Sequence, residues 1–311
     1  MSGLFRAHLA LLAVNLIYGA NYLIAKGLMP NLIQPSGFIM LRVLGATTLF
    51  WILRLTVQHQ PVAPRDFWRL ALCGLFGVAG NQLLFFNGLN LTSPINAAII
   101  MTANPILVLV MASVLLGERI AGVRVAGIIA GGAGAVWLIL TSADGSALGG
   151  NWKGDLMILL NAASYALYLV MVKPLMQKYS PITVISWVFL LGAVVVMPVG
   201  WSQFSAIEWG TFSTADVGAA AFVVIGTTFF AYLLNIFAIR VVSPNVVSSY
   251  IYLQPLTATA FAALFAWLGW SVVDYTGGLT AGKVLSAVLI FIGVYLVSKP
   301  GIDRARKKSQ N

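Results

Sequence analysis

Polar and aromatic side chains recur along one face of the first apolar stretch of the sequence. In chain order they are Asn15, Tyr18, Tyr22 and Lys26. Spacings of three and four residues place side chains on one side of an α-helix. Inside an apolar helix, such a face is expected to meet protein or water rather than lipid. Phenol rings can stack on a bound solute, and amides can orient it through hydrogen bonds.

A later apolar stretch repeats this pattern with Asn161, Tyr165 and Tyr168. Two interpretations are open for each of these residues. The side chain lines a cavity that binds a solute, or it forms a hydrogen bond between helices worth about 0.6–2 kcal/mol. Because the two stretches carry the same residue types at similar spacing, we favour a cavity for the set.

Further amide and aromatic side chains lie in other apolar stretches, and we expect them in the same cavity. They are Asn81, Phe85, Asn104, Tyr250 and Gln254. Asn104 precedes Pro105 and Gln254 precedes Pro255. Proline inside a helix lacks the N–H donor and crowds the preceding turn, so a kink is expected at each proline. A kinked segment persists in a membrane only where its backbone packs in protein or lines a cavity. These two positions therefore mark the predicted centre of the site.

Arg42 lies inside the second apolar stretch. Burying its charge unpaired in a membrane costs about 3 kcal/mol or more. One interpretation is that the long side chain reaches back to the membrane surface. The other is that it holds a substrate carboxylate or the carbonyl end of a helix. Arg42 and Lys26 are therefore candidates for a gate or a charge anchor.

The acidic residues all fall in predicted loops or at predicted helix ends. They are Asp66, Glu118, Asp144, Asp155, Glu208, Asp216, Asp274 and Asp303. Without an embedded carboxylate, a proton relay and a site for a lone organic cation both lack a charged partner. This favours a facilitator or exchanger of neutral, zwitterionic or weakly anionic solutes. Glu118 is a candidate inner gate, and the alternative is a solvated ion pair with Arg119 worth about 1 kcal/mol or less.

The sequence contains no complete motif for nucleotide binding or metal chemistry. Gly277, Gly282 and Lys283 imitate a phosphate-binding loop, but Val284 stands where a Mg²⁺-binding serine or threonine belongs. The chain has one cysteine, so a disulfide within it is excluded. We expect no cofactor, no metal and no enzymatic activity.

The composition is that of a membrane protein. Of 311 residues, 60% are hydrophobic and only 8% are charged, whereas soluble domains carry about 25% charged residues. The net charge of +10 is better explained by cytoplasmic loops that face anionic lipid than by nucleic acid.

Ten apolar stretches predict an all-α integral membrane protein with ten membrane-spanning helices. We expect them at 7–28, 36–56, 68–89, 94–116, 121–140, 153–176, 181–200, 216–238, 244–268 and 280–298. Lysine and arginine gather in the links on one side, for example Arg65, Arg119 and Lys178, and in the C-terminal tail. Cytoplasmic loops are enriched in these residues, so both termini are predicted to be cytoplasmic.

The chain contains two related five-helix units, predicted at 1–145 and 146–311. Ser93-Pro94 and Asn104-Pro105 are matched 150 residues later by Ser243-Pro244 and Gln254-Pro255. Tyr18, Lys26 and Met29 are matched 147 residues later by Tyr165, Lys173 and Met176. A unit with an odd number of spans ends on the opposite side, so the second unit must be inverted relative to the first. Inverted repeats are common in secondary transporters.

These motifs resemble a known family. Ala97-Ala98, Pro105, Gly117-Glu118-Arg119, Gly127 and Gly134 resemble the end of an EamA domain of the drug/metabolite transporter superfamily, and the second half repeats the pattern with Pro244, Pro255, Gly269 and Gly293. Trp270 departs from it, standing where the first half has Glu118. The resemblance covers nearly the whole chain and implies a ten-helix exporter or exchanger of small metabolites, often amino acids, with a cavity between the halves.

The predicted function is a secondary transporter of small neutral or zwitterionic metabolites such as amino acids. It would work by alternating access, and its expected partners are a small-molecule solute and the lipid bilayer, with no nucleic acid. The expected location is a bacterial inner membrane, and a monomer is the working expectation. The alternatives are a lipid-modifying membrane enzyme, which would need an acid–base or metal constellation, and a non-transporting scaffold or receptor.

Overall fold

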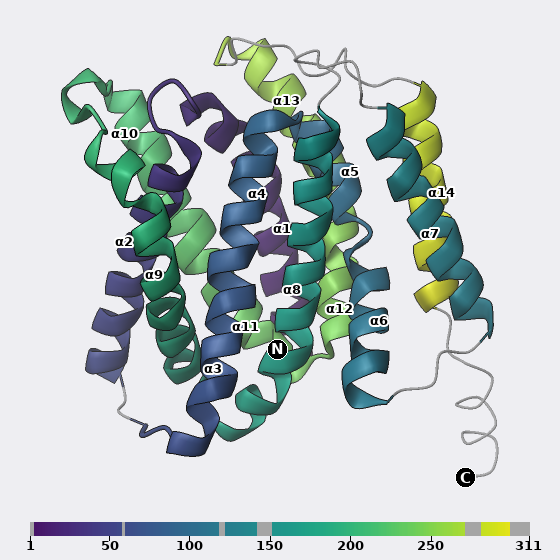
Figure 1. Cartoon of the computed structure of the whole chain (residues 1–311), viewed down its shortest axis with the longest axis horizontal. Coiled ribbons are helices and arrows are strands. Elements are labelled where there is room, and N and C mark those ends of the chain that lie inside the picture. Colours follow the sequence, from purple (N-terminus) through teal and green to yellow (C-terminus); the bar gives the residue numbers. More distant parts are fainter. Residues whose placement is uncertain (1–2, 58–59, 118–121, 142–150, 271–280, 299–311) are drawn as a thin grey trace.

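The computed structural model describes residues 3–57, 60–117, 122–141, 151–270 and 281–298. Within these ranges the chain is a bundle of helices with no strand (Figure 1). Eight of the helices, counted with their short internal interruptions joined, are long and apolar enough to cross a membrane. The prediction of an all-α integral membrane protein is therefore confirmed. The count of ten spans and the inverted topology stay predictions.

The first half contains the following helices: α1 (Gly3–Leu28), α2 (Pro35–Val57), η1 (Pro64–Asp66), α3 (Phe67–Gly74), η2 (Leu75–Ala79), α4 (Gly80–Leu91), α5 (Pro94–Met101), α6 (Asn104–Leu116) and α7 (Gly122–Thr141). The segment from η1 to α4 is one continuous apolar rod, in which η2 is a π-helical turn. Widened turns of this kind appear often at functional sites.

The second half contains a matching series: α8 (Trp152–Lys178), α9 (Pro181–Ser205), η3 (Trp209–Thr211), α10 (Thr214–Ala221), η4 (Phe222–Phe230), α11 (Ala231–Val241), α12 (Pro244–Ser249), η5 (Tyr250–Tyr252), α13 (Leu253–Trp267) and α14 (Ala281–Ser298). Here η4 is the π-helical segment, between α10 and α11. The π-helical turns thus occur in corresponding rods of the two halves.

The proline-containing helices begin with the same capping arrangement. The Ser93 side chain accepts a hydrogen bond from the Asn96 N–H at 3.2 Å, and the Ser243 side chain accepts one from the Val246 N–H at 3.4 Å. Each serine is followed by a proline in the first turn, where a missing N–H removes no helix bond.

Both proline-containing helices are interrupted near their middle. The α5 helix ends at Met101, and the N–H groups of Thr102 and Ala103 bond three residues back, to the Ile99 and Ile100 carbonyls at 3.0 Å. The α6 helix then begins at Asn104, which places Pro105 in its first turn. In the second half the interruption is the short 3-10 turn η5, directly before α13.

Helices of one half pack against helices of the other. The α1 helix packs against α11 and α13, and α8 packs against α4 and α6. The α2 helix packs on α9, while α7 packs on α14 at one side of the bundle (Figure 1). A side chain at Gly293 would come within 2.5 Å of the Gly127 carbonyl oxygen, so α7 and α14 touch backbone to backbone.

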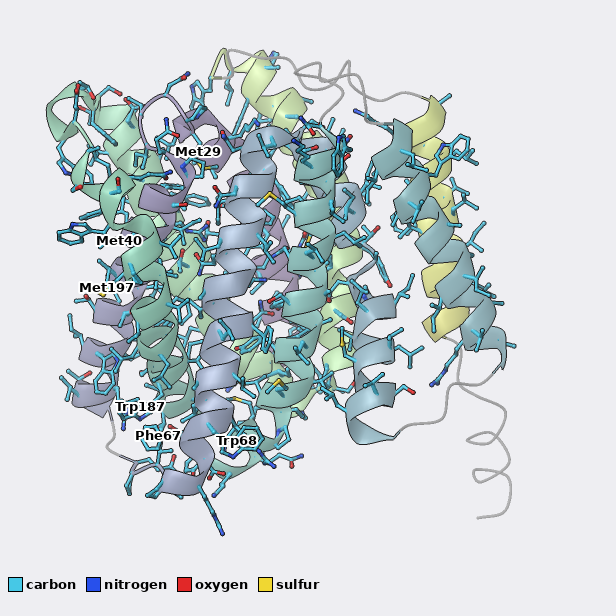
Figure 2. The ribbon with its side chains drawn as sticks, in the orientation of Figure 1. Met29, Met40, Phe67, Trp68, Trp187 and Met197 are labelled. Atoms are coloured by element: carbon cyan, nitrogen blue, oxygen red, sulfur yellow. The ribbon has the colours of Figure 1, made fainter. Side chains whose placement is uncertain are left out.

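Aromatic side chains collect where α2 ends and α3 begins. Trp187 contacts Trp51 and Phe67 edge to face, with ring centroids 5.2 and 4.9 Å apart. Figure 2 shows Phe67, Trp68 and Trp187 together at this end of the bundle. The Arg54 guanidinium lies over the Trp51 and Trp187 rings. Such a cluster of tryptophan and arginine is typical of a membrane–water interface.

Candidate functional site

A cavity lies inside the bundle and is lined by helices from both halves. Its walls come from α1, α2, α4 and α5 of the first half and from α8, η4, α11, η5 and α13 of the second. The space between its lining atoms measures about 550 Å³, open solvent included. Within the described part of the chain, Arg42 is the one charged side chain on its walls.

Seven of the predicted cavity residues lie on its walls. They are Tyr18, Tyr22, Asn81, Phe85, Asn161, Tyr165 and Gln254. The two polar-aromatic stripes, on α1 and α8, therefore contribute to one cavity. The Asn161 amide donates to the Asn81 carbonyl at 2.7 Å, which holds α8 against α4 at this point.

Gln254 connects the cavity to the packing of α13 on α1. Its Oε1 accepts a hydrogen bond from the Tyr22 hydroxyl at 2.7 Å, and its Nε2 donates to the Asn15 Oδ1 at 3.0 Å. Asn15 is not among the lining residues and also donates to the Leu11 carbonyl. Its place behind Gln254 fits a positioning role.

Asn104 and Tyr250 are away from the cavity walls. The Asn104 amide is buried and donates to the Ala162 carbonyl at 2.8 Å, joining α6 to α8. Tyr250 shares a 2.7 Å hydrogen bond with the His8 Nδ1 near the start of α1. Both side chains therefore link the two halves of the chain.

Tyr168 lies in a small adjoining pocket together with Tyr165, Tyr232 and Asn235. Its ring covers Gly77 in the π-helical turn η2, where an added Cβ would come within 2.3 Å of it. Only a glycine at position 77 leaves room for this ring.

Lys26 caps the end of another helix. Its Nζ donates to the Leu89 and Asn90 carbonyls at 2.7 Å and to the Thr92 carbonyl at 3.0 Å. Carbonyl groups at a helix C-terminus lack partners and attract cations. Lys26 thus fixes α1 to the end of α4. Glu118, the third candidate for a gate or charge anchor, lies outside the described residues.

Lys173 makes the matching contact in the second half. Its Nζ donates to the Ile239 carbonyl and, at 2.8 Å, to the Val242 carbonyl, at the end of α11. Lys26 and Lys173 are matched positions of the internal sequence repeat, and in the structure each lysine caps the C-terminal end of a helix.

Arg42 points into the interior. Its side chain is 2% exposed, and its Nε donates to the Thr228 hydroxyl at 2.9 Å. The guanidinium carbon lies 4.1 Å from the centre of the Phe86 ring. A side chain that reached back to the membrane surface would not show this burial.

Several lining residues were missed from the sequence. Asn21 falls three residues after Tyr18, so helical spacing alone could have placed it on the same face. Helical spacing could not have predicted that Tyr232 lines the cavity, because its position depends on how α11 packs. Its hydroxyl donates to the Gly77 carbonyl at 3.1 Å and lies 3.3 Å from the Asn81 Oδ1.

Asp155 is more buried than its place in the sequence indicates. It lies in the first turn of α8, as expected for a helix end, but its side chain is 0% exposed. It accepts hydrogen bonds from the Thr92 hydroxyl and, at 3.2 Å, from the Asn96 amide. These bonds join α8 to the start of α5 and do not reach the cavity walls.

Metal binding has no candidate centre in the described ranges. Across them, no group of three or more histidine, cysteine, aspartate or glutamate side chains is placed to hold a metal ion.

The fold and the cavity define a multi-pass α-helical membrane protein with a chamber inside its bundle that aromatic and amide side chains line. The model of the EamA-like transporter family matches residues 5–140 and again 152–299. The chain belongs to this family, and the two matches correspond to its two halves.

Two similar proteins share only about a quarter of their residues with this chain, but the similarity extends over most of its length. The uncharacterized transporter YyaM of Bacillus subtilis is 26% identical over 75% of this chain and 73% of its own length. A probable terminal-alkyne amino-acid exporter of Streptantibioticus cattleyicolor is 26% identical over 79% of this chain and 77% of its own. A solved crystal structure with a TM-score of 0.61 and 19% identity covers 94% of this chain and 96% of that one, which shows a shared fold.

Proposed function

We propose that the chain is a secondary transporter that exports or exchanges small neutral or zwitterionic metabolites, such as amino acids, across a bacterial inner membrane. Both termini would lie in the cytoplasm. The observation that carries this proposal is the cavity whose walls come from both halves of the chain. A relative described as a probable amino-acid exporter supports the solute class.

Alternating access fits the way the halves are joined. The α1 helix packs in the second half and α8 packs in the first, so a movement of one half against the other must change the cavity walls. Interruptions between α5 and α6 and at η5 put short irregular turns within the two rods that could bend. Discontinuous helices beside a central site are a recurring feature of secondary transporters.

The cavity chemistry supports transport over catalysis. Tyrosine hydroxyls and amides line it, and none of its described wall residues is a histidine or a carboxylate. A lipid-modifying enzyme would need such groups for proton transfer. Amides and phenols are better suited to hold a solute and release it unchanged.

The test is efflux of a metabolite panel from cells with and without the chain, followed by counterflow in liposomes that contain only the purified protein. We expect at least one small zwitterionic or neutral solute to move faster with the protein. If no solute moves in liposomes made with monodisperse protein, the proposal is wrong.

A further inference from the structure

We propose that Arg42 binds a carboxylate of the transported solute, so that the cargo is a small carboxylate-bearing molecule rather than an amine, a sugar or a neutral amide. This inference rests on the proposed transport function, because it names the chemical class that the same cavity accepts.

The guanidinium of Arg42 is held firmly before any solute binds. Its Nε donates to the Thr228 hydroxyl, and that hydroxyl donates in turn to the Val223 carbonyl at 2.7 Å. Phe86 supports the guanidinium face, with its ring centre 4.1 Å away. A planar cation stacked on an aromatic ring and tied at one nitrogen keeps its remaining N–H groups aimed in a fixed direction.

At least one of those remaining donors lacks a protein acceptor. The Nη1 atom is buried and has no hydrogen-bond partner. No carboxylate occurs among the described residues on the cavity walls. Arginine stays protonated in proteins, and a buried unpaired charge is costly. The arrangement is therefore completed by an anion that enters the cavity, and a carboxylate can accept two parallel hydrogen bonds from a guanidinium.

Acceptors for the other end of a zwitterion lie on other walls of the same cavity. The Oδ1 atoms of Asn21 and Asn161 are buried without a hydrogen-bond partner. An ammonium group donates three hydrogen bonds and could use both. An amine without a carboxylate would instead meet the positive charge of Arg42 uncompensated. An inorganic anion such as chloride could also occupy Arg42, so the experiment must separate it from a carboxylate.

The chain offers a matched control on the same helix. Arg54 is also buried, also lies over aromatic rings and stands in the last turn of α2, but it is not on the cavity walls. Replacing Arg54 by glutamine removes a buried arginine charge without changing the cavity. Arg42→Lys keeps the charge but loses the planar pair of donors.

The experiment uses purified full-length protein in liposomes and two matched series of probes. One series is L-leucine, L-leucinamide and isoamylamine, and the other is L-phenylalanine, L-phenylalaninamide and phenethylamine. Each probe is tested as an inhibitor of counterflow of the panel solute that moves fastest, in chloride buffer and in chloride-free sulfate buffer. Binding is read separately from the ligand-induced shift in thermal midpoint.

We expect the carboxylates to inhibit at least about 10-fold more strongly than the amides and amines with wild-type protein. Arg42→Gln should weaken the carboxylates by about 10- to 100-fold and bring acid and amide to similar potency, with Arg42→Lys between the two. Arg54→Gln should leave the acid-to-amide ratio unchanged. If Arg42→Gln is not monodisperse, Arg42→Lys replaces it, and an unchanged acid-to-amide ratio in that variant overturns the role of Arg42.

Two results would overturn the inference while leaving transport intact. One is equal potency of acid and amide with wild-type protein, including the case in which only chloride affects the rate. The other is an unchanged ratio in folded Arg42→Gln. If the wild-type protein moves nothing but carboxylates still raise its thermal midpoint through Arg42, the transport proposal fails and the carboxylate site stands.

Discussion

At the scale of single residues, two amides that the sequence treats as equivalent do different work. Gln254 lies on the cavity wall and bonds Tyr22 and Asn15 of α1. Asn104 is buried away from the wall and bonds the Ala162 carbonyl of α8. Each joins its helix to the other half of the chain, but of the two only Gln254 also lines the cavity.

Replacing the two amides should therefore separate stability from solute preference. Asn104→Leu removes one buried hydrogen bond and should lower stability by about 1–3 kcal/mol while leaving the order of preferred solutes unchanged. Gln254→Leu should lower stability to a similar extent and also change that order. Thermal midpoints and counterflow rates across the solute panel measure both effects. A changed preference in Asn104→Leu would place that residue in the binding site instead.

Much of the site was predictable at this scale, and the reason is helical spacing. The pairs Tyr18–Tyr22 and Asn161–Tyr165 could be predicted to share a helix face because each is four residues apart, and both line the cavity. The burial of Arg42 and the place of Tyr232 could not, because they depend on how α2, η4 and α11 pack. Periodicity shows which residues share a face, but not which neighbour that face meets.

At the scale of elements, the two halves repeat the same devices. Lys26 of α1 caps the end of α4, and Lys173 of α8 caps the end of α11. Gly117 after α6 and Gly269 after α13 both have φ of 67°, a left-handed conformation that favours glycine at helix ends. In the sequence, these pairs are identical residues at matched positions of the two halves. Their structural roles, capping a helix end or adopting a left-handed backbone conformation, could be assigned only from the structure.

The two lysine caps should contribute to stability by similar amounts. Lys26→Met and Lys173→Met each leave helix-end carbonyls without their charged donor, which should cost about 1.5–3 kcal/mol. Lys178→Met is the control, because its ion pair with Asp66 involves a side chain that is 40% exposed and should contribute less to stability than either lysine cap. Thermal midpoints of the three purified variants check this. A Lys178→Met loss as large as that of the caps would contradict it.

At the scale of the whole molecule, the first helix of each half is embedded in the other half. Because α1 and α8 each line the cavity and pack in the other half, any movement of one half relative to the other changes the shape of the cavity. Arg42 is the one charged side chain among the described wall residues of this cavity. The buried carboxylate of Asp155 lies elsewhere, between α8 and the start of α5, and holds those helices together. The arrangement favours a solute gradient over a proton gradient as the driving force.

Efflux from liposomes should accordingly persist when the pH gradient is removed. We expect the rate to follow the solute gradient and to change by less than about twofold with an ionophore that equalises pH, because no described cavity wall residue is a carboxylate or histidine that could carry the proton. Asp155→Asn tests the fully buried carboxylate between α8 and the start of α5. It should lower the thermal midpoint and leave the response to a pH gradient unchanged, since Asp155 bonds Thr92 and Asn96 rather than the solute. Efflux that requires a pH gradient in the wild type, and loses that requirement in Asp155→Asn, would instead make Asp155 the proton carrier and the protein a proton-coupled exporter.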